Sequence, residues 1–239
     1  MPPRVALFAT CLADQFWPEV LHATVAVLER AGCAVDFDPR QTCCGQPACN
    51  SGFAAEARSV ARHFVDVFAD AEHVVAPSGS CVAMVHRFAD LFAGEPHQQK
   101  RCADLAHRTH ELSHFLVDVL GVTDLGAHFP HHVAWHDPCH ARRELHVHDQ
   151  PRRLLAAVRG LHLHELHAKD SCCGFGGTFS VKYPELSTAM LDHKLGDLPT
   201  EVTTLASLDS SCLMQMRGRL QRQGRNVHVL HLAEILASR

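Results

Sequence analysis

The sequence is poor in aromatic side chains and has no long apolar run. It contains one Tyr and two Trp, so it offers no aromatic ladder on which bases or sugars could stack. No segment approaches the roughly 18 consecutive apolar residues of a membrane-spanning helix, and we expect no membrane span. Blocks of like charge are missing, and the formal net charge is −4. Because a nucleic-acid-binding protein would show a basic stripe or patch, we expect no nucleic-acid partner.

Several short motifs of catalysis are also missing. The sequence has no G-x-S-x-G, no H-E-x-x-H and no G-x-G-x-x-G, which are motifs of serine hydrolases, zinc proteases and dinucleotide-binding folds. The start of the chain, MPPRVALFATC, has an apolar run of only about six residues, too short for a secretory signal. We therefore expect a cytoplasmic protein.

Cysteine and histidine, in contrast, are abundant. There are 11 cysteines and 21 histidines. Two cysteine pairs are adjacent, Cys43-Cys44 and Cys172-Cys173, and neighbouring residues do not reach good disulfide geometry without strain. In a reducing compartment, clustered cysteines indicate metal or redox chemistry. The histidines are scattered, and we expect most of them on solvated faces.

The chain repeats itself. Residues 4–11 match 132–139, residues 41–52 match 170–180, residues 77–84 match 208–215, and residues 113–120 match 230–237. The matched cysteines are Cys11 and Cys139, Cys43 and Cys172, Cys44 and Cys173, Cys81 and Cys212. Each half thus has one cysteine, then Cys-Cys-Gly, then one more cysteine. We predict two tandem repeat domains, 1–125 and 126–239, that meet in the Gly- and Pro-containing segment 122–130.

Strand and helix patterns alternate in each half. Helical spacing covers residues 19–32, 53–70, 81–92, 152–161, 183–198 and 212–224, and strand-like runs cover 73–81, 161–166 and 202–212. This alternation predicts an α/β fold: two pseudo-repeat domains, each a small, mostly parallel sheet flanked by helices. Open α/β sheets build their sites on loops at the carboxyl ends of strands, so we expect metal sites on those loops.

Four thiolates per half are a donor set for either a [4Fe–4S] cluster or a tetrahedral zinc ion. Zinc fingers and ribbons use C-x-x-C knuckles, and the sequence has none. Adjacent cysteines splay their side chains and more easily reach two metal atoms than one. Gly45 and Gly174 follow the pairs and permit amides to point at sulfur, which tunes cluster potentials. This favours a polynuclear cluster and leaves zinc open.

Other residues near the motifs are weaker candidates. His136 and His140 flank Cys139 and are candidates for donors to the metal centre or for a ligand. Cys33 and Cys102 have no partner in the other half and are expected in the core. Cys49, five residues after Cys44, is a further neighbour of the first site.

The doubled Cys-Cys-Gly pattern resembles the cysteine-rich "CCG" domain family. The segments that carry the resemblance are TCLADQFWPEV, QTCCGQPACNSG, PSGSC, CCGFGGTFSVKYPELS and HLAEIL, and it extends over essentially the whole chain. Members of this family include the cysteine-rich subunit of heterodisulfide reductase, the iron–sulfur subunit of glycolate oxidase and a subunit of anaerobic glycerol-3-phosphate dehydrogenase.

The resemblance implies an iron–sulfur cluster in each half. Its ligands would be Cys11, Cys43, Cys44 and Cys81 in the first half and Cys139, Cys172, Cys173 and Cys212 in the second. It also implies an electron-transfer subunit of a complex that oxidises L-lactate to pyruvate. The partners would be a larger ferredoxin-type iron–sulfur protein and a third subunit of a lactate utilization complex.

The sequence departs from the family motif at one position in each half. The full motif ends in C-x-x-C, and Met84 and Gln215 stand where the fifth cysteine would be. A thioether and an amide are poor ligands for iron, so we expect a four-thiolate cluster rather than the non-cubane cluster of the heterodisulfide reductases. The alternatives are a zinc-binding structural or sensor protein, with zinc in at least one half, and a disulfide reductase.

Overall fold

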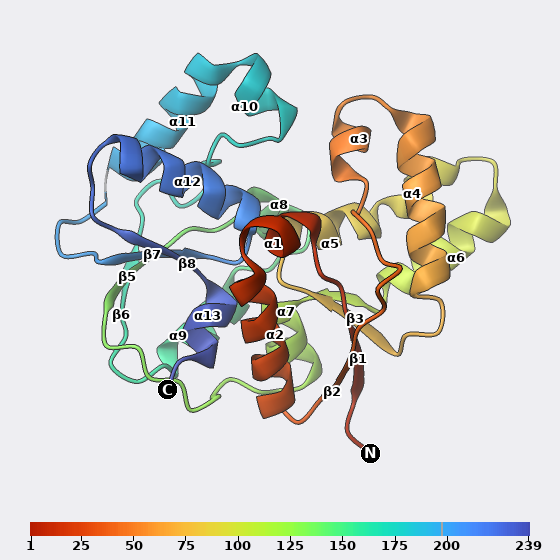
Figure 1. Cartoon of the computed structure of the whole chain (residues 1–239), viewed down its shortest axis with the longest axis horizontal. Coiled ribbons are helices and arrows are strands. Elements are labelled where there is room, and N and C mark those ends of the chain that lie inside the picture. Colours follow the sequence, from red (N-terminus) through yellow and green to blue (C-terminus); the bar gives the residue numbers. More distant parts are fainter. Residues whose placement is uncertain (197) are drawn as a thin grey trace.

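The computed structural model describes residues 1–196 and 198–239 and contains two parallel four-stranded sheets (Figure 1). The first sheet has the order β2-β1-β3-β4 and the second the order β6-β5-β7-β8. The strands are β1 (Arg4–Leu7), β2 (Ala34–Asp36), β3 (His73–Ala76), β4 (Thr109–Glu111), β5 (His132–Trp135), β6 (His162–Glu165), β7 (Thr204–Ser207) and β8 (His228–His231). The same strand order appears on both sides of the predicted boundary.

Helices connect successive strands in both halves. The first half contains α1 (Cys11–Phe16), α2 (Pro18–Arg30), α3 (Gln46–Asn50), α4 (Ala54–Val67), α5 (Gly79–His86), η1 (Phe88–Phe92), α6 (Pro96–Ala106), α7 (Leu112–His114) and η2 (Phe115–Val119). The second contains α8 (Cys139–Arg143), α9 (Asp149–Ala156), α10 (Thr178–Lys182), α11 (Pro184–Gly196), α12 (Ser210–Arg222) and α13 (Leu232–Ala237). The predicted α/β class with parallel sheets is confirmed. The division into domains 1–125 and 126–239 stays a prediction.

The predicted helices and strands are present with shifted ends. The predicted helix over 81–92 begins earlier, at Gly79, where Ser78 caps it, and α5 ends at His86 before the 3-10 turn η1. The helix predicted over 152–161 ends at Ala156, and Gly160 follows with a φ of +76°, outside the helical region. Within the helix predicted over 183–198, residue 197 lies outside the described residues.

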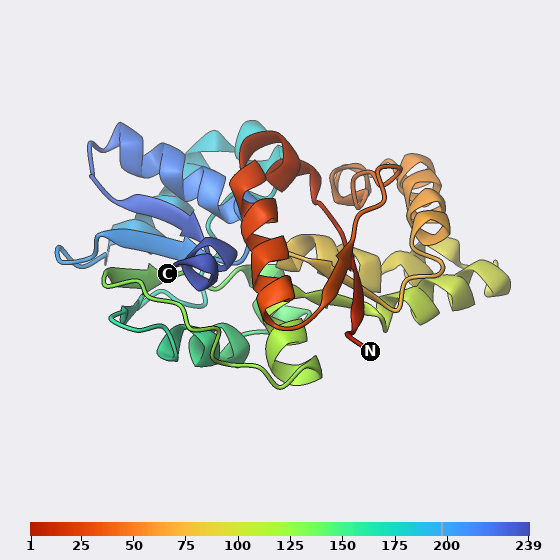
Figure 2. The same ribbon diagram turned by 60° about the horizontal axis from the view of Figure 1, so that its bottom comes forward.

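The two halves share one hydrophobic core. A single cluster of buried side chains includes Val5 and Val75 from the first sheet and Val133 and Trp135 from the second. Helix α13 packs on α2, and α7 packs on α9, so helices near the end of each half lie on a helix of the other half (Figures 1 and 2). Arg30 at the end of α2 donates hydrogen bonds to carbonyl oxygens of residues 125, 236 and 237. These contacts fix how the two sheets face each other.

The helix caps at the ends of β4 and β8, Glu111 and His231, are both buried but differ in chemistry. Glu111 accepts hydrogen bonds from the amides of Ser113 (2.8 Å) and His114 (3.2 Å) at the start of α7. At the start of α13, His231 Nδ1 accepts from the amide of Ala233 at 3.0 Å, and its other ring nitrogen contacts the Pro77 carbonyl oxygen of the first half at 3.1 Å. Both side chains satisfy amides that a helix start leaves without partners.

Glu111 should make stability depend on pH. Burial raises the pKa of Glu111 from its ordinary value of 4.5 to about 7. The folded state therefore holds a proton that the unfolded state has already released, and stability is lost as pH rises from about 5 to about 7. We expect Glu111→Gln to be more stable than the wild type at pH 8 by up to about 3 kcal/mol, and to differ much less at pH 5. Urea unfolding of both proteins at the two pH values measures this, and a pH-independent difference would refute it.

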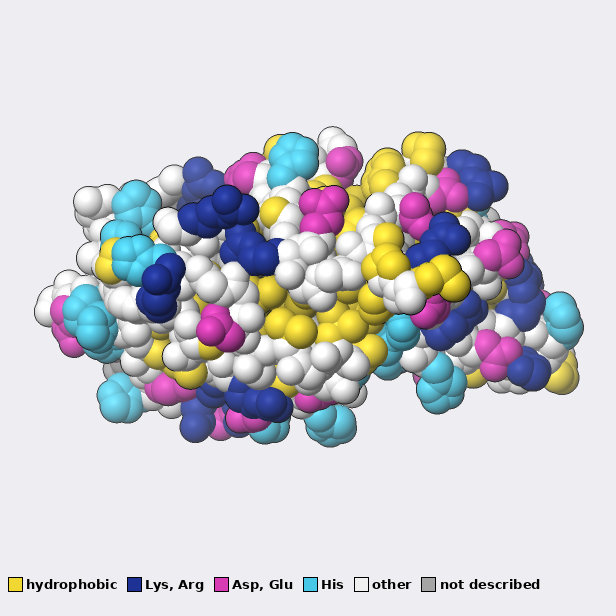
Figure 3. All heavy atoms as spheres, turned by 90° about the horizontal axis from the view of Figure 1, so that it is seen from below, with side chains coloured by type: hydrophobic (Ala, Val, Ile, Leu, Met, Phe, Trp, Pro, Cys, Tyr) yellow, Lys and Arg dark blue, Asp and Glu magenta, His cyan; other side chains and the backbone are white. Residues whose placement is uncertain are grey.

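None of the helices in the described residues is both long and apolar enough to cross a membrane. Figure 3 shows histidine side chains distributed over one face of the molecule, mostly apart from one another and among charged side chains. The expectation that many histidines lie on solvated faces holds for this surface.

Candidate metal centre

All eight motif cysteines line one cavity, which lies between the two halves. Its volume is about 220 Å³. The cysteines that line it are Cys11, Cys43, Cys44, Cys81, Cys139, Cys172, Cys173 and Cys212. They follow the carboxyl ends of strands β1, β2, β3, β5, β6 and β7, the edge at which open α/β sheets bind ligands. The two sequence-predicted sets thus face the same space.

Four of these cysteines lie at helix starts. Cys11 and Cys139 are the first residues of α1 and α8, and Cys81 and Cys212 lie in the first turns of α5 and α12. A helix start presents backbone amides without partners in the helix. The repeat therefore places the lone cysteines of both halves at equivalent helix starts.

The Cys-Cys-Gly loops direct backbone amides at sulfur, as the sequence predicted. Gly45 has a φ of +81° and Gly174 a φ of +79°. In these conformations the Gly45 amide donates to Cys43 Sγ at 3.4 Å, and the Gly174 amide donates to Cys172 Sγ at 3.3 Å. Hydrogen bonds of this kind stabilise thiolates and set cluster potentials.

One thiol in each set is strongly acidic. A hydrogen bond from Cys11, with a further one from Cys44, lowers the pKa of Cys43 to about 3. A hydrogen bond from Cys139 lowers the pKa of Cys172 to about 2 in the same way. The pKa values of Cys11 and Cys139 are raised in turn, because each donates to its partner. Each half without metal is thus arranged around one thiolate.

Two residues at equivalent positions of the repeat join the halves beside the two cysteine sets. Ser78 and Asp209, which stand three residues before Cys81 and Cys212, form an isolated antiparallel bridge. The Ser78 hydroxyl donates to Asp209 Oδ2 at 3.2 Å, and the Ser80 amide donates to the same oxygen at 2.9 Å. Asp209 is 1% exposed and lines the cavity. A buried carboxylate therefore joins the two halves beside the sulfurs.

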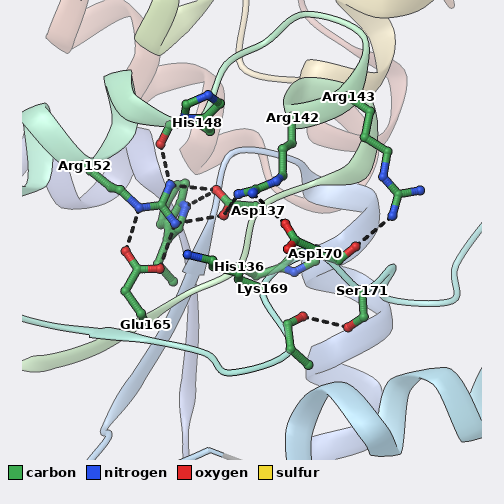
Figure 4. A network of polar contacts seen from close by, with 12 residues as sticks. His136, Asp137, Arg142, Arg143, His148, Arg152, Glu165, Lys169, Asp170 and Ser171 are labelled. Atoms are coloured by element: carbon green, nitrogen blue, oxygen red, sulfur yellow. Dashed lines mark hydrogen bonds and ion pairs between the residues drawn. The ribbon is translucent and has the colours of Figure 1, made fainter.

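A polar network supports the loop that carries Cys139. Asp137 is 3% exposed and accepts hydrogen bonds from Trp135 Nε1 and from the guanidinium groups of Arg142 and Arg152 (Figure 4). Arg152 also pairs with Glu165 at 2.6 Å. This network holds the segment between β5 and α8 in place.

The second set has polar neighbours that the first lacks. His136 is fully buried, and neither ring nitrogen has a hydrogen-bond partner among the residues that the structure describes. Burial lowers the pKa of His136 to about 3. Lys194 is also fully buried, and its ammonium donates to the carbonyl oxygens of Ala168 and Ser171, just before the Cys-Cys-Gly loop. In the first half, Phe8 occupies the place of His136.

The donor sets fit an iron–sulfur cluster or zinc. The cysteines are free thiols, and sulfur atoms approach within each set: Cys11 and Cys43 at 3.6 Å, Cys173 and Cys212 at 3.2 Å. The buried ring nitrogens of His136 have no partner in residues 1–196 and 198–239, as expected where a metal completes the site.

Six residues that the motifs brought into question are not among those that line the cavity, and His136 is one of them; His140 does line it. Met84 is buried in the first-half core, and Gln215 donates to the Ser187 hydroxyl at 2.8 Å; neither lines the cavity. Cys33 and Cys102 are buried core residues, as expected. Cys49 is partly buried on α3 and does not line the cavity either.

Sequence reasoning missed three features of the site. It did not predict that both sets share one cavity, that Asp209 bridges the halves, or that Lys194 is buried. The signal for Asp209 was present in the match of PSGSC with LDSSC, where an acidic residue replaces Ser78.

Comparison with known proteins places these observations in a family. Lactate utilization protein A of Oceanobacillus iheyensis is 46% identical over 98% of this chain and 96% of its own length. Lactate utilization protein A of Shouchella clausii is 48% identical over 99% of both chains. Among solved structures, a glutamate racemase of Bacillus anthracis matches with a TM-score of 0.37 and 10% identity, over 99% of this chain and 79% of its own.

The model of the CCG cysteine-rich domain matches twice, at residues 5–86 and 133–217. The two matches enclose the two cysteine sets and follow the internal repeat. The chain therefore belongs to the CCG cysteine-rich domain family, with one such domain sequence in each half.

Proposed function

We propose that this chain is an iron–sulfur electron-transfer subunit of a complex that oxidises L-lactate to pyruvate. The observation that carries the proposal is the cavity lined by all eight motif cysteines. The lactate part of the proposal comes from the relatives, which are named for lactate utilization and align over nearly their whole length.

The residues of each half would hold one [4Fe–4S] cluster. Cys11, Cys43, Cys44 and Cys81 are the proposed ligands of the first. Cys139, Cys172, Cys173 and Cys212 are the proposed ligands of the second. When bound, such a cluster supplies a one-electron carrier whose potential depends on charge, burial and hydrogen bonds to sulfur.

The chain's own groups set the conditions around these ligands. The amides of Gly45 and Gly174 donate to sulfur, and hydrogen bonds to sulfur tune cluster potentials. The buried Asp209 side chain lies between the two sets and accepts hydrogen bonds from Ser78 and Ser80. Because both sets line one cavity, electrons would have only a short distance to travel between the halves.

A complex needs partners. We propose a larger ferredoxin-type iron–sulfur protein and a third subunit, and we place the complex in the cytoplasm, where free thiols persist. A lactate-oxidising subunit would normally expose a flavin or nicotinamide site, and the sequence has no dinucleotide-binding motif. The chemistry on lactate is therefore assigned to a partner.

Zinc is the second candidate, and one observation favours it in the second half. Ligand atoms of His136, Cys173 and Cys212 lie within 4.8 Å of one another, a compact nitrogen–sulfur set that zinc also accepts. A structural or sensor role would follow. A disulfide reductase of the heterodisulfide reductase type is less well supported, because Met84 and Gln215 stand where the fifth cysteine of each half would be and are poor ligands for iron.

Lactate-dependent reduction tests the proposed role. The protein is purified without oxygen, alone and with its two partner subunits, and the visible absorption near about 400 nm is followed after L-lactate is added. We expect bleaching only with the partners present. Oxidation of lactate by the isolated chain, or steady thiol–disulfide turnover by it, would contradict the electron-transfer role.

A further inference from the structure

The two metal sites have different surroundings, although the cysteine pattern repeats. Position 8 in the first half and position 136 in the second are equivalent, because residues 4–11 match residues 132–139. Phe8 is fully buried and packs edge-on against Phe64 at 4.8 Å between ring centroids. His136 is equally buried but is an imidazole with two nitrogens to satisfy.

Among the described residues, neither nitrogen of His136 has a hydrogen-bond partner, and both Nδ1 and Nε2 are buried. In Figure 4, His136 lies beside the Asp137 network, and none of the dashed contacts drawn there reaches it. Burying a polar group without a partner is unfavourable, so a buried imidazole of this kind calls for a ligand.

The ring lies beside the sulfurs of the second set. His136, Cys173 and Cys212 each offer one ligand atom, and these three atoms lie within 4.8 Å of one another. It is the one such group among the described residues. A second orphaned atom, the buried hydroxyl oxygen of Ser210, belongs to a residue that lines the cavity two positions before Cys212.

We propose that His136 is a nitrogen ligand to an iron of the second-half cluster, which makes the two clusters chemically different. The second site then has five protein donors, His136 with Cys139, Cys172, Cys173 and Cys212, and the first has four. The inference rests on the proposed iron–sulfur clusters but not on lactate. Imidazole is a known ligand to iron in iron–sulfur proteins.

A buried cation further distinguishes the second site. The ammonium of Lys194 is buried against the backbone that leads into Cys172, with hydrogen bonds of 2.7 Å and 3.0 Å to the carbonyl oxygens of Ala168 and Ser171. The counterpart helix of the first half, α4, buries only apolar side chains, among them Phe64 and Val65. The surroundings of the two clusters therefore differ in charge as well as in the proposed ligand.

Isotope labelling tests the ligand without any substitution. The protein is produced with ¹⁵N-histidine in a ¹⁴N background, purified without oxygen and reduced, and pulsed EPR records the nitrogen hyperfine couplings. We expect a directly bonded ¹⁵N coupling on one of two cluster signals. Two cluster signals without such a coupling would overturn the inference and leave the proposed function intact. A protein without any cluster would overturn both.

A matched pair of variants identifies the histidine. His136→Phe introduces the residue of the first half and should abolish the nitrogen coupling, while the circular dichroism spectrum stays that of the wild type. His140→Phe is the comparison, because His140 Nδ1 lies 3.7 Å from Cys139 Sγ and its ring is partly exposed. A coupling that survives in His136→Phe, or that is lost only in His140→Phe, would contradict the assignment. If His136→Phe fails to fold, His136→Cys replaces it and should also lose the coupling while keeping a cluster.

Discussion

Replacing Cys172 by serine is expected to remove the metal of the second half and to leave that of the first. Cys172 is the thiolate of its set, with a pKa lowered to about 2 by hydrogen bonds from Cys139 and other neighbours. A serine hydroxyl stays protonated and is a poor ligand for iron. About four of about eight irons should be lost, with an equal share of sulfide. Iron and sulfide analysis of protein purified without oxygen measures the effect.

Two further variants serve as controls for Cys172→Ser. Cys43→Ser changes the equivalent thiolate and should remove the other half of the iron. Cys49→Ser changes a partly buried cysteine that does not line the cavity and should leave the iron content unchanged. Loss of all iron from either single variant would show that the two sites do not load independently. The shared hydrophobic core and the Ser78–Asp209 bridge would then be the physical route of the coupling.

Gly174→Ala is expected to be far more damaging than Gly45→Ala. A Cβ at position 174 would lie 2.5 Å from the carbonyl oxygen of Ser187, a backbone atom of α11. At position 45 the nearest atom would be a Val60 methyl at 3.3 Å, which can move. Both glycines have positive φ, so both variants suffer about 1–2 kcal/mol of backbone strain.

The clash at position 174 adds to that strain. We expect Gly174→Ala to lower the free energy of unfolding by about 3–5 kcal/mol in total and to lose the second metal, because α11 or the Cys-Cys-Gly loop must move. Gly177→Ala is a third comparison, since Gly177 has a φ of +60° and open space around its Cα. Chemical unfolding measures the free energy of unfolding of the three variants and ranks them by it. Equal destabilisation by Gly174→Ala and Gly45→Ala would contradict the close packing of α11 on the loop.

The sheet architecture and the cysteine positions could be predicted from the sequence. Short apolar runs such as VALF and VAWH precede cysteines at equivalent places, and helices with one apolar face lie between them. In a parallel sheet, all such runs end at the same edge. The prediction that cysteines gather on loops at strand ends therefore needed only local patterns and the repeat.

The relative placement of the two halves could not be predicted in this way. It depends on contacts between residues far apart in the chain, such as Arg30 with the carbonyl oxygens of Leu236 and Ala237. No local pattern specifies these contacts. The single cavity, and the approach of the two cysteine sets that it implies, follow from this long-range packing.

The ligand role proposed for His136 could be predicted only in part from the sequence. It is a candidate because it lies near Cys139. The sharper signal is that it replaces the apolar Phe8 in a repeat whose other strand positions match well. A polar residue in place of a core residue indicates a ligand only once its burial and missing partners are known, and both required the structure.

Metal analysis of the whole chain tests the central claim most directly. Iron, acid-labile sulfide and zinc are measured on protein purified without oxygen, together with the visible absorption spectrum. Two clusters held by the eight cysteines predict about eight irons, a matching amount of sulfide and a broad band near about 400 nm. Zinc without sulfide would mean that the cysteines bind metal for structure alone, and the electron-transfer role would be wrong.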